Sequence, residues 1–344
     1  MVRLQCGHRP LAELLRFLML YFEDFAVGRT EPYGVLTIDE AEMLAFAREF
    51  DPQPMHLDRQ SEQARLMGGL LASGWFTVSA NMRLMVDGFL GQSSSMAGPG
   101  VSSVRWAKPV RAGDVLGGRF TILDRKASRS KPDRGFVRFL LTLTNRADEL
   151  VFEQDCLVMF GRREPARDAE ETASAIARPI PGDLPPMPTH ESLGPIDDIP
   201  VGAVVRWGDH HFSEEAIIRF GKRFDPQAFH TSRAGGEASH FGGLVASGWH
   251  SAAAWLRTVI DRWAVLEAAG PVPARGPGFG LKDVVWFKPV YAGDTLTYYS
   301  KVLEARRSAS KPGWGILTQH NYAYNQRGEL ALAFVGSALW GARS

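Results

Sequence analysis

Asp51-Pro-Gln-Pro-Met-His56, followed by Gly68-Gly-Leu-Leu-Ala-Ser-Gly-Trp75, occurs a second time in this chain as Asp225-Pro-Gln-Ala-Phe-His230 and Gly242-Gly-Leu-Val-Ala-Ser-Gly-Trp249. Both parts of this block recur at an offset of 174 residues. A carboxylate and an imidazole five residues apart, with a glycine-flanked segment downstream, predict an acid/base pair that faces a backbone N–H donor. The repeat therefore predicts two such constellations.

The repeat extends over most of each half. Asp24-Phe-Ala-Val-Gly28 matches Asp198-Ile-Pro-Val-Gly202 at the same offset, whereas Trp106-Ala-Lys-Pro-Val-Arg-Ala-Gly-Asp114 matches Trp286-Phe-Lys-Pro-Val-Tyr-Ala-Gly-Asp294 at an offset of 180. The second copy thus carries six additional residues between these anchors. A duplicated domain explains the pattern and gives an N-terminal extension over 1–20, a first domain over 21–162, a linker rich in Pro and Ala over 163–195 and a second domain over 196–344.

Composition limits what the two domains can do. A chain of 344 residues with 45% apolar content can bury two cores, and its net charge of +1 argues against binding nucleic acid through bulk electrostatics. No apolar run approaches the roughly 18 residues that a membrane span requires. Two cysteines, Cys6 and Cys156, in unrelated contexts suggest neither a disulfide framework nor a thiolate metal site. We therefore expect a cytoplasmic protein with a small-molecule substrate.

The coarse secondary structure can be predicted within each copy. Thr37-Ile-Asp-Glu40 is a capping-box pattern that predicts a helix over about 38–50 with Asp51 at its end, and the equivalent helix begins near Ser213. The pair Gly68-Gly69 is interpreted as the entry of a second helix that is apolar almost all round and therefore buried. Four strand-like runs follow, separated by Gly, Pro, Asp and Asn, at 101–106, 115–124, 135–144 and 151–160.

This succession resembles the MaoC-like dehydratases, relatives of the (R)-specific enoyl-CoA hydratases. The resemblance rests on the helix, Asp-x-x-x-x-His, Gly-Gly-Leu-x-Ala-Ser-Gly-Trp and Lys-Pro-Val-x-x-Gly-Asp, and it covers roughly 21–162 and 196–342. It implies an α+β fold of two hotdog domains, each a long central helix wrapped by a curved antiparallel sheet, paired as an internal pseudo-dimer. The central helices are then expected near 68–88 and 242–263.

The resemblance also implies which residues form the site. Asp51 with His56, and Asp225 with His230, match the two catalytic positions of the family motif. The remaining positions lie inside the expected central helix, where Gly74 and Gly248 match a glycine whose backbone N–H faces the thioester oxygen. Beside these glycines, Ser73 and Ser247 replace a frequent histidine and are expected to contact substrate. Further departures are an asparagine replaced by Gln53 and Gln227 and a proline replaced by Ala228.

The activity implied is that of a hydratase or dehydratase that interconverts a 2-enoyl-CoA and a 3-hydroxyacyl-CoA, with the R configuration expected from the resemblance alone. An ionised Asp and a His of near-neutral pKa can share one water, the Asp acting as base while the His positions water and returns the proton. CoA is part of the substrate, so we expect no separate cofactor and no metal. Acyl-CoA is the expected partner; nucleic acid and membrane are not, and assembly beyond the internal pair is left open.

Other interpretations of these residues stay open. An Asp after a helix is often a turn residue, and a His five residues on can simply bond a backbone carbonyl. A hotdog acyl-CoA thioesterase and a non-catalytic acyl-binding module are alternatives to the hydratase. Because both Asp and both His are kept while Met55 and Phe229 diverge, we favour two chemically competent pockets. Four basic residues either meet CoA phosphates or lie in solvated turns: Lys131, Lys311, Arg129 and Arg307.

Overall fold

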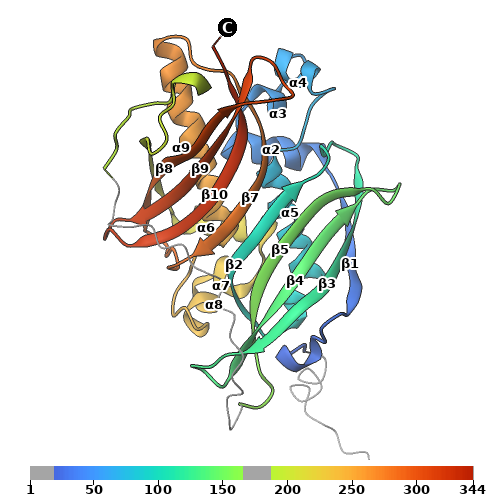
Figure 1. The fold of residues 1–344 in the computed structure, drawn as a ribbon. Coiled ribbons are helices and arrows are strands. Elements are labelled where there is room, and N and C mark those ends of the chain that lie inside the picture. Colours follow the sequence, from blue (N-terminus) through green and yellow to red (C-terminus); the bar gives the residue numbers. More distant parts are fainter. Residues whose placement is uncertain (1–18, 166–186, 344) are drawn as a thin grey trace, which may run out of the picture.

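The computed structural model describes residues 19–165 and 187–343 (Figure 1). Residues 1–18 of the predicted N-terminal extension and much of the predicted linker lie outside the described residues, as does Cys6. Within the described chain, the elements of the first half run from Phe22 to Gly161 and those of the second half from Ile196 to Gly341. No helix in these two ranges is both long and apolar enough to cross a bilayer.

The helices of the first half are repeated in the second. The first half contains α2 (Glu40–Phe50), α3 (Pro54–Leu57), α4 (Glu62–Leu66) and the central α5 (Gly74–Gly88). The second half contains α6 (Glu214–Phe224), α7 (Ala228–Thr231), α8 (Arg233–Ala238) and the central α9 (Gly248–Ala269). Short 3₁₀ helices occur at η1 (Phe22–Asp24), η2 (Leu90–Gln92) and η3 (Ile196–Asp198).

The strands form one continuous antiparallel sheet. Those of the first half are β1 (Thr30–Thr37), β2 (Ser95–Trp106), β3 (Val115–Ala127), β4 (Arg134–Thr144) and β5 (Leu150–Gly161). Those of the second are β6 (Val204–His211), β7 (Arg275–Trp286), β8 (Thr295–Arg307), β9 (Trp314–Asn325) and β10 (Leu330–Gly341). The order is β1-β3-β4-β5-β2-β7-β10-β9-β8-β6, so β2 and β7 join the halves, with Val104 opposite Leu281. The predicted α+β class with two similar domains is confirmed.

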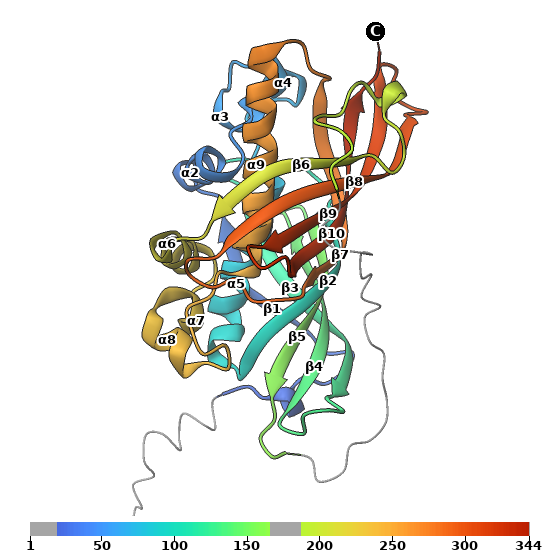
Figure 2. The ribbon, with the colours of Figure 1, turned by 90° about the vertical axis from the view of Figure 1, so that its left-hand side faces the viewer.

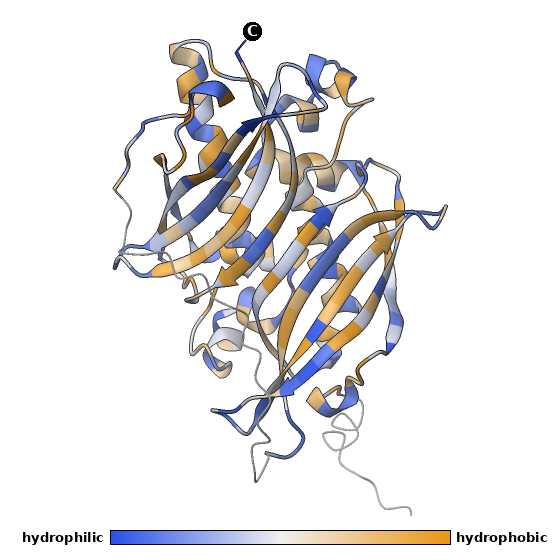
Figure 3. Ribbon diagram, viewed as in Figure 1, coloured by the Kyte–Doolittle hydropathy of each residue, from blue (hydrophilic) through white to orange (hydrophobic). Residues whose placement is uncertain are grey.

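The helices lie on one side of this sheet, which curves around α5 and α9 (Figure 2). Alternation along the strands explains why one face is buried, because successive side chains point to opposite faces. In β4 every second residue from Gly135 to Leu143 is buried, and these residues face the helices. Hydrophobic and hydrophilic residues accordingly alternate along the strands (Figure 3).

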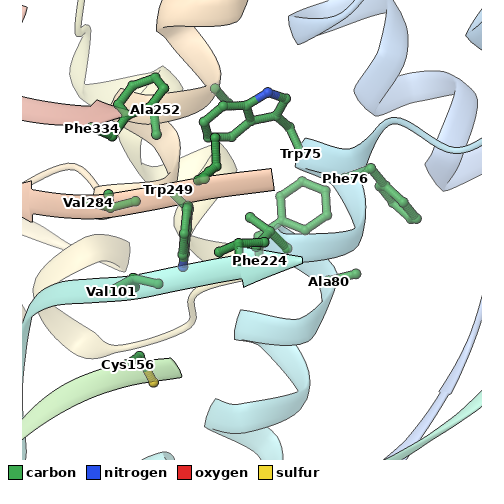
Figure 4. Packing of buried hydrophobic residues seen from close by; sticks show 14 of the residues in the cluster. Trp75, Phe76, Ala80, Val101, Cys156, Phe224, Trp249, Ala252, Val284 and Phe334 are labelled. Atoms are coloured by element: carbon green, nitrogen blue, oxygen red, sulfur yellow. The ribbon is translucent and has the colours of Figure 1, made fainter. Parts of the chain in front are cut away.

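Aromatic residues join the two halves between the central helices. The rings of Trp75 and Trp249, one from the start of each central helix, are 6.4 Å apart, and Phe334 lies 5.7 Å from Trp75 (Figure 4). Phe46 of α2 contacts Phe224 of α6 edge-on at 5.5 Å. One core therefore runs through both halves, as the internal pseudo-dimer requires.

The six additional residues of the second copy lengthen its central helix. The offset stays at 174 from α2 to α6 and at the starts of α5 and α9, and it becomes 180 at β2 and β7. Between these points α5 has 15 residues and α9 has 22. The additional turns carry Trp263, which is 1% exposed and therefore belongs to the core.

The structure corrects the predicted helix starts. The central helices begin at Gly74 and Gly248, six residues later than expected, and α9 continues to Ala269. Gly68 and Gly69 do not enter a helix; they adopt φ values of 75° and 119° in a turn after α4, a backbone region that favours glycine. Ser73 caps α5 by accepting a hydrogen bond from the Trp75 N–H.

Strand and cap predictions had mixed outcomes. All four predicted strands of the first half occur and are longer than expected. The cap of α2 is Asp39, which accepts from the Glu42 N–H, so the Thr37 prediction was wrong; α6 begins directly after its cap Ser213, so the predicted start near Ser213 is confirmed. Strand β1 was not predicted because Tyr33 is its only buried residue, which leaves no alternating pattern.

Candidate active site

Asp51 and His56 come together because a helix ends immediately before a short one begins. Asp51 is the C-terminal cap of α2, and His56 lies in the single turn of α3. Their side chains meet through His56 Nε2 and Asp51 Oδ2, 3.2 Å apart. Both residues are buried, with 2% of Asp51 and 6% of His56 exposed. A buried charge requires such a partner, so the two groups hold each other in place.

Three further contacts fix the ionisation and orientation of this pair. The Ser73 hydroxyl donates to Asp51 Oδ2 at 2.6 Å, and Gln53 Nε2 donates to Oδ1 at 2.7 Å. On the other side, His56 Nδ1 lies 3.0 Å from the carbonyl oxygen of Leu71. A carbonyl only accepts, so Nδ1 carries a hydrogen and Nε2 is the atom left to exchange a proton with Asp51 or with substrate.

The pKa values of the pair move apart. Burial favours the neutral acid of Asp51, but the charge of His56 and hydrogen bonds from His56, Ser73 and Gln53 outweigh burial and lower the pKa of Asp51 below its ordinary 3.8. Burial also opposes protonation of His56, but the charge and hydrogen bond of Asp51, with the Leu71 carbonyl, raise the pKa of His56 above 6.5. Both shifts favour the ion pair of an ionised Asp51 and a protonated His56.

The second pair repeats this geometry closely. His230 Nε2 lies 3.3 Å from Asp225 Oδ2, and His230 Nδ1 lies 2.7 Å from the Val245 carbonyl oxygen. Ser247 donates to Asp225 Oδ2 at 2.7 Å, and Gln227 donates to Oδ1 at 2.9 Å. Each His thus contacts a backbone carbonyl and an Asp at the same time. The simpler interpretation, in which it bonds a carbonyl alone, does not describe either copy.

Gly74 and Gly248 occupy the first turn of a central helix, not its interior. Amides in the first turn have no intrahelical partner and lie at the positive end of the helix dipole, which suits a developing oxyanion. The glycine itself has a packing reason, because a Cβ at Gly74 would lie 2.8 Å from Trp106 Cε2, and one at Gly248 would lie 2.5 Å from Trp286 Cε2. Each indole also donates to the carbonyl of its glycine at 3.0 Å.

Ser73 and Ser247 are buried beneath the two pairs. Ser73 is 0% exposed and Ser247 1% exposed, and each hydroxyl is taken up by an Asp. Neither serine lines the cavity described next. Their contacts are those of residues that orient the carboxylates.

A cavity of about 420 Å³ opens beside the first pair and is built largely by the second half. Asp51, His56 and Gly74 line one part of it. Other first-half residues, from Gln53 to Val110, line it as well, and the larger part of the lining comes from the second half, mainly from α9 and strands β7, β9 and β10, through residues that include Trp255, Val259, Trp263, Gly280, Gln319, Asn321, Gly336 and Trp340. Trp255 and Trp263 are eight residues apart, so the cavity follows α9 for about 12 Å. Sequence reasoning gave no residue of β9 or β10 a role in the site.

The matching interior of the first half is packed with aromatic rings. Phe139 stands where the second half has Gln319; it is 0% exposed, and its ring lies 5.5 Å from Phe89 and 5.6 Å from Phe120. Cys156 stands where the second half has Gly336 and is 3% exposed. Comparing core positions between the two copies, rather than motifs, is the signal that would have revealed which half is hollow.

The four basic residues expected near CoA phosphates are all exposed, and none lines this cavity. Arg307 is bound to Asp197 through two hydrogen bonds of 2.6 and 2.9 Å. Lys131 lies close enough to His240 that its charge, after burial and Arg134, contributes to lowering the pKa of that imidazole. Phosphate contact therefore stays a prediction for these residues. Within the described ranges, no cluster of three or more His, Cys, Asp or Glu is arranged to hold a metal ion.

Comparisons with known proteins agree with this architecture. The family model for the MaoC like domain matches residues 28–139 and 198–316, more than half of the chain. The uncharacterized protein YdeM of Bacillus subtilis (strain 168) is 29% identical over 141 residues, which cover 41% of this chain and 98% of YdeM.

Two solved structures are similar over nearly the whole chain. A putative MaoC domain protein dehydratase from Chloroflexus aurantiacus J-10-fl has a TM-score of 0.75 at 18% identity, covering 95% of this chain and 98% of that one. A conserved hypothetical protein from Mycobacterium tuberculosis with a double hotdog fold has a TM-score of 0.69 at 17% identity, covering 94% of this chain and 99% of that one. With both segments matched by the family model, the chain belongs to the MaoC-like domain family and has a double hotdog fold.

Proposed function

We propose that this protein adds water to a 2-enoyl-CoA, or removes it from the corresponding 3-hydroxyacyl-CoA, at the Asp51–His56 pair. The observation that carries the proposal is a buried carboxylate–imidazole pair that opens, beside a helix N-terminus, onto a cavity of about 420 Å³. The cavity is largely apolar in lining, which suits an acyl chain. The R configuration of the product is carried over from the family resemblance.

The reaction follows from the contacts of the pair. In hydration the Asp51 carboxylate takes a proton from a water that contacts both it and His56, and the water oxygen bonds to the β-carbon of the enoyl group. The π electrons of the double bond move onto the thioester oxygen, where the Gly74 N–H stabilises the enolate. The enolate then collapses as the pair returns a proton to the α-carbon. In total, one OH is added to the β-carbon and one H to the α-carbon, and the pair returns to its starting protonation state.

The partners of Asp51 suit this role. Hydrogen bonds from Ser73 and Gln53 keep the carboxylate ionised, while the Leu71 carbonyl holds the His56 ring with Nε2 toward the reacting water. General acid–base catalysis of this kind contributes about 10² to 10⁴ in rate, and one oxyanion donor about 10² to 10³.

We propose that the second pair does not turn over the longer acyl groups. Asp225 and His230 keep the local geometry, but the interior that would receive their acyl chain is filled by Phe139 and its neighbours. We assign turnover of acyl groups longer than the enoyl unit to the first pair. On this assignment the first half supplies the acid/base pair, and the second half supplies the acyl site.

A single assay separates hydration from thioester hydrolysis. Purified protein is given crotonyl-CoA and octenoyl-CoA while the enoyl absorbance and free thiol are followed together. We expect the enoyl absorbance to fall without thiol release, and the loss of octenoyl-CoA to disappear with Asp51→Asn. Release of thiol at the rate of substrate loss would instead establish a thioesterase, and binding without either change would establish an acyl-binding module.

A further inference from the structure

The cavity beside Asp51 carries side-chain N–H groups that no atom of the described chain accepts. They are Nε1 of Trp255, Nε1 of Trp263, Nε2 of Gln319, and Nε and Nη1 of Arg275. All five atoms are donors. Trp263 is 1% exposed, so its N–H lies in the core and not at a solvent-covered rim. A buried donor without an acceptor is costly, and four such residues around one cavity indicate a ligand that supplies acceptors.

Two other indoles that line the same cavity donate their N–H groups to acceptors of the protein. Trp340 Nε1 donates to the Gly194 carbonyl at 2.9 Å, and Trp207 Nε1 donates to the Ser300 hydroxyl at 2.6 Å. That hydroxyl in turn donates to Asn321 Oδ1. These two indoles of the cavity are therefore hydrogen-bonded to the protein, which distinguishes Trp255 and Trp263 from them.

The donors also belong to the features that distinguish the second half from the first. Gln319 replaces Phe139, and Trp263 lies in the region where α9 extends beyond the length of α5. Asn81, the counterpart of Trp255, is hydrogen-bonded by Tyr33 at 2.5 Å. The cavity and its unpaired donors thus occur at the same positions of the second half. At the corresponding positions of the first half, the side chains are packed in the core or hydrogen-bonded.

The charges around the cavity indicate which kind of ligand acceptor these donors would bind. The Arg275 guanidinium already forms an ion pair with Glu267 through Nη2, so the cavity does not need a ligand carboxylate to balance it. Trp255, Trp263 and Gln319 are neutral donors. A neutral oxygen, such as a hydroxyl or keto group, satisfies them without bringing a second negative charge near Glu267 and the ionised Asp51.

We propose that this cavity selects acyl thioesters whose chain carries a neutral hydrogen-bond-accepting oxygen, a hydroxyl or keto group, recognised by Trp255, Trp263 and Gln319. The inference rests on the proposed function for the placement of the thioester, and it names the substrate class of that same site. An alkyl chain of equal length fits the volume but leaves the donors unpaired, and that difference supplies the discrimination.

Binding of saturated thioesters tests the inference without any turnover. Octanoyl-CoA and its ω-hydroxy, (ω−1)-keto and ω-carboxy analogues are titrated calorimetrically into wild-type protein, Trp263→Phe and Gln319→Leu. The matched control is Trp340→Phe, which changes an indole of the same cavity whose N–H is already used. We expect the hydroxy or keto chain to bind more tightly than the alkyl chain, and each test variant to reduce that ratio by roughly three- to tenfold.

In the control variant both chains should lose affinity equally. Tighter binding of the alkyl chain, or a ratio unchanged in both test variants, would overturn the inference and assign the donors to water alone. Preference for the carboxy chain would overturn the charge argument. Failure of the hydratase assay leaves these affinities measurable, so the two proposals fail separately.

Discussion

Arg257, in the central helix of the second half, donates from Nη1 to the backbone carbonyl of Glu49 at 3.1 Å, two residues before Asp51. The same nitrogen contacts the Arg48 carbonyl at 3.0 Å. A cation at the last carbonyls of a helix satisfies groups that lack intrahelical partners and complements the helix dipole. One half of the molecule therefore fixes the end of the helix that positions the Asp of the other half.

The relationship is reciprocal, which supplies its own control. Arg83, 174 residues earlier, donates to the carbonyls of Lys222 and Arg223 at the end of α6, just before Asp225. We predict that Arg257→Met lowers kcat on octenoyl-CoA by about 10- to 100-fold, because small misplacements of a reacting group are costly, and that Arg83→Met changes it little. Steady-state kinetics on both variants decide the matter; equal losses would indicate a general loss of packing between the halves.

Asp51→Asn and Asp225→Asn should differ by orders of magnitude. The amide keeps the shape of the side chain but removes the base, so Asp51→Asn is expected to lower kcat/KM by about 10² to 10⁴. Asp225→Asn is expected to stay within a few-fold of wild type on octenoyl-CoA. The measurement is hydration rate on short and long enoyl-CoAs. A large loss in both variants would show two working sites and refute the assignment of longer acyl groups to the first pair.

The pH dependence follows from the direction of the two pKa shifts. The pKa of Asp51 is lowered by His56, Ser73 and Gln53 against the effect of burial, so the carboxylate stabilises the fold above pH 3.8, and this contribution is lost as pH falls through the lowered pKa. The pKa of His56 is raised, so its contribution is complete below pH 6.5 and is lost as pH rises through the raised pKa. Activity that needs the ion pair should therefore fall below the lowered pKa of Asp51 and above the raised pKa of His56.

Ser73→Ala tests the acid limb of that profile. Removing the 2.6 Å hydrogen bond raises the pKa of Asp51, so the acid limb of kcat/KM should move to higher pH. Because Ser73 is 0% exposed and its partner is charged, the free energy of unfolding near neutral pH should fall by about 1.5 to 3 kcal/mol. A pH–rate profile and a urea titration check the two effects. An unmoved acid limb would mean that Asp51 does not control it.

A comparison of the two copies explains which features of the site could be predicted from the sequence and which could not. The pairing of each Asp with its His could be predicted because both copies keep residue types that packing alone does not demand, and because Asp51 follows a well-patterned helix. The helix start at Gly74 was not, because the Leu70–Ala72 stretch is apolar like the helix yet bonds to other segments, with the Ala72 N–H donating to the Val110 carbonyl.

The cavity was concealed for a different reason. Part of its lining comes from Gln319 and Gly336 on strands far along the chain, and neither residue type indicates a pocket by itself. Their counterparts in the first half, Phe139 and Cys156, fill the equivalent volume. The cavity can therefore be recognised only by comparing the core residues of the two halves. Such a comparison becomes possible only once the strand register pairs Gly336 with Gln319 across β9 and β10.

Gly336 gives the sharpest test of where the acyl chain lies. A Cβ at this position would lie 3.4 Å from Asn321 Nδ2 and 3.7 Å from Leu281 Cδ2, so the two methyl groups of a valine must occupy cavity space. We predict that Gly336→Val raises KM for octenoyl-CoA by roughly tenfold or more while leaving crotonyl-CoA nearly unaffected, because only the longer chain reaches between α9 and β10. The control is Cys156→Val, a change of similar kind at the equivalent position of the packed half, which should cost less than about 1.5 kcal/mol of stability and leave chain-length preference unchanged. Equal losses on both substrates in Gly336→Val would place the acyl chain elsewhere, whereas a shift in preference caused by Cys156→Val would show that the first half also receives it.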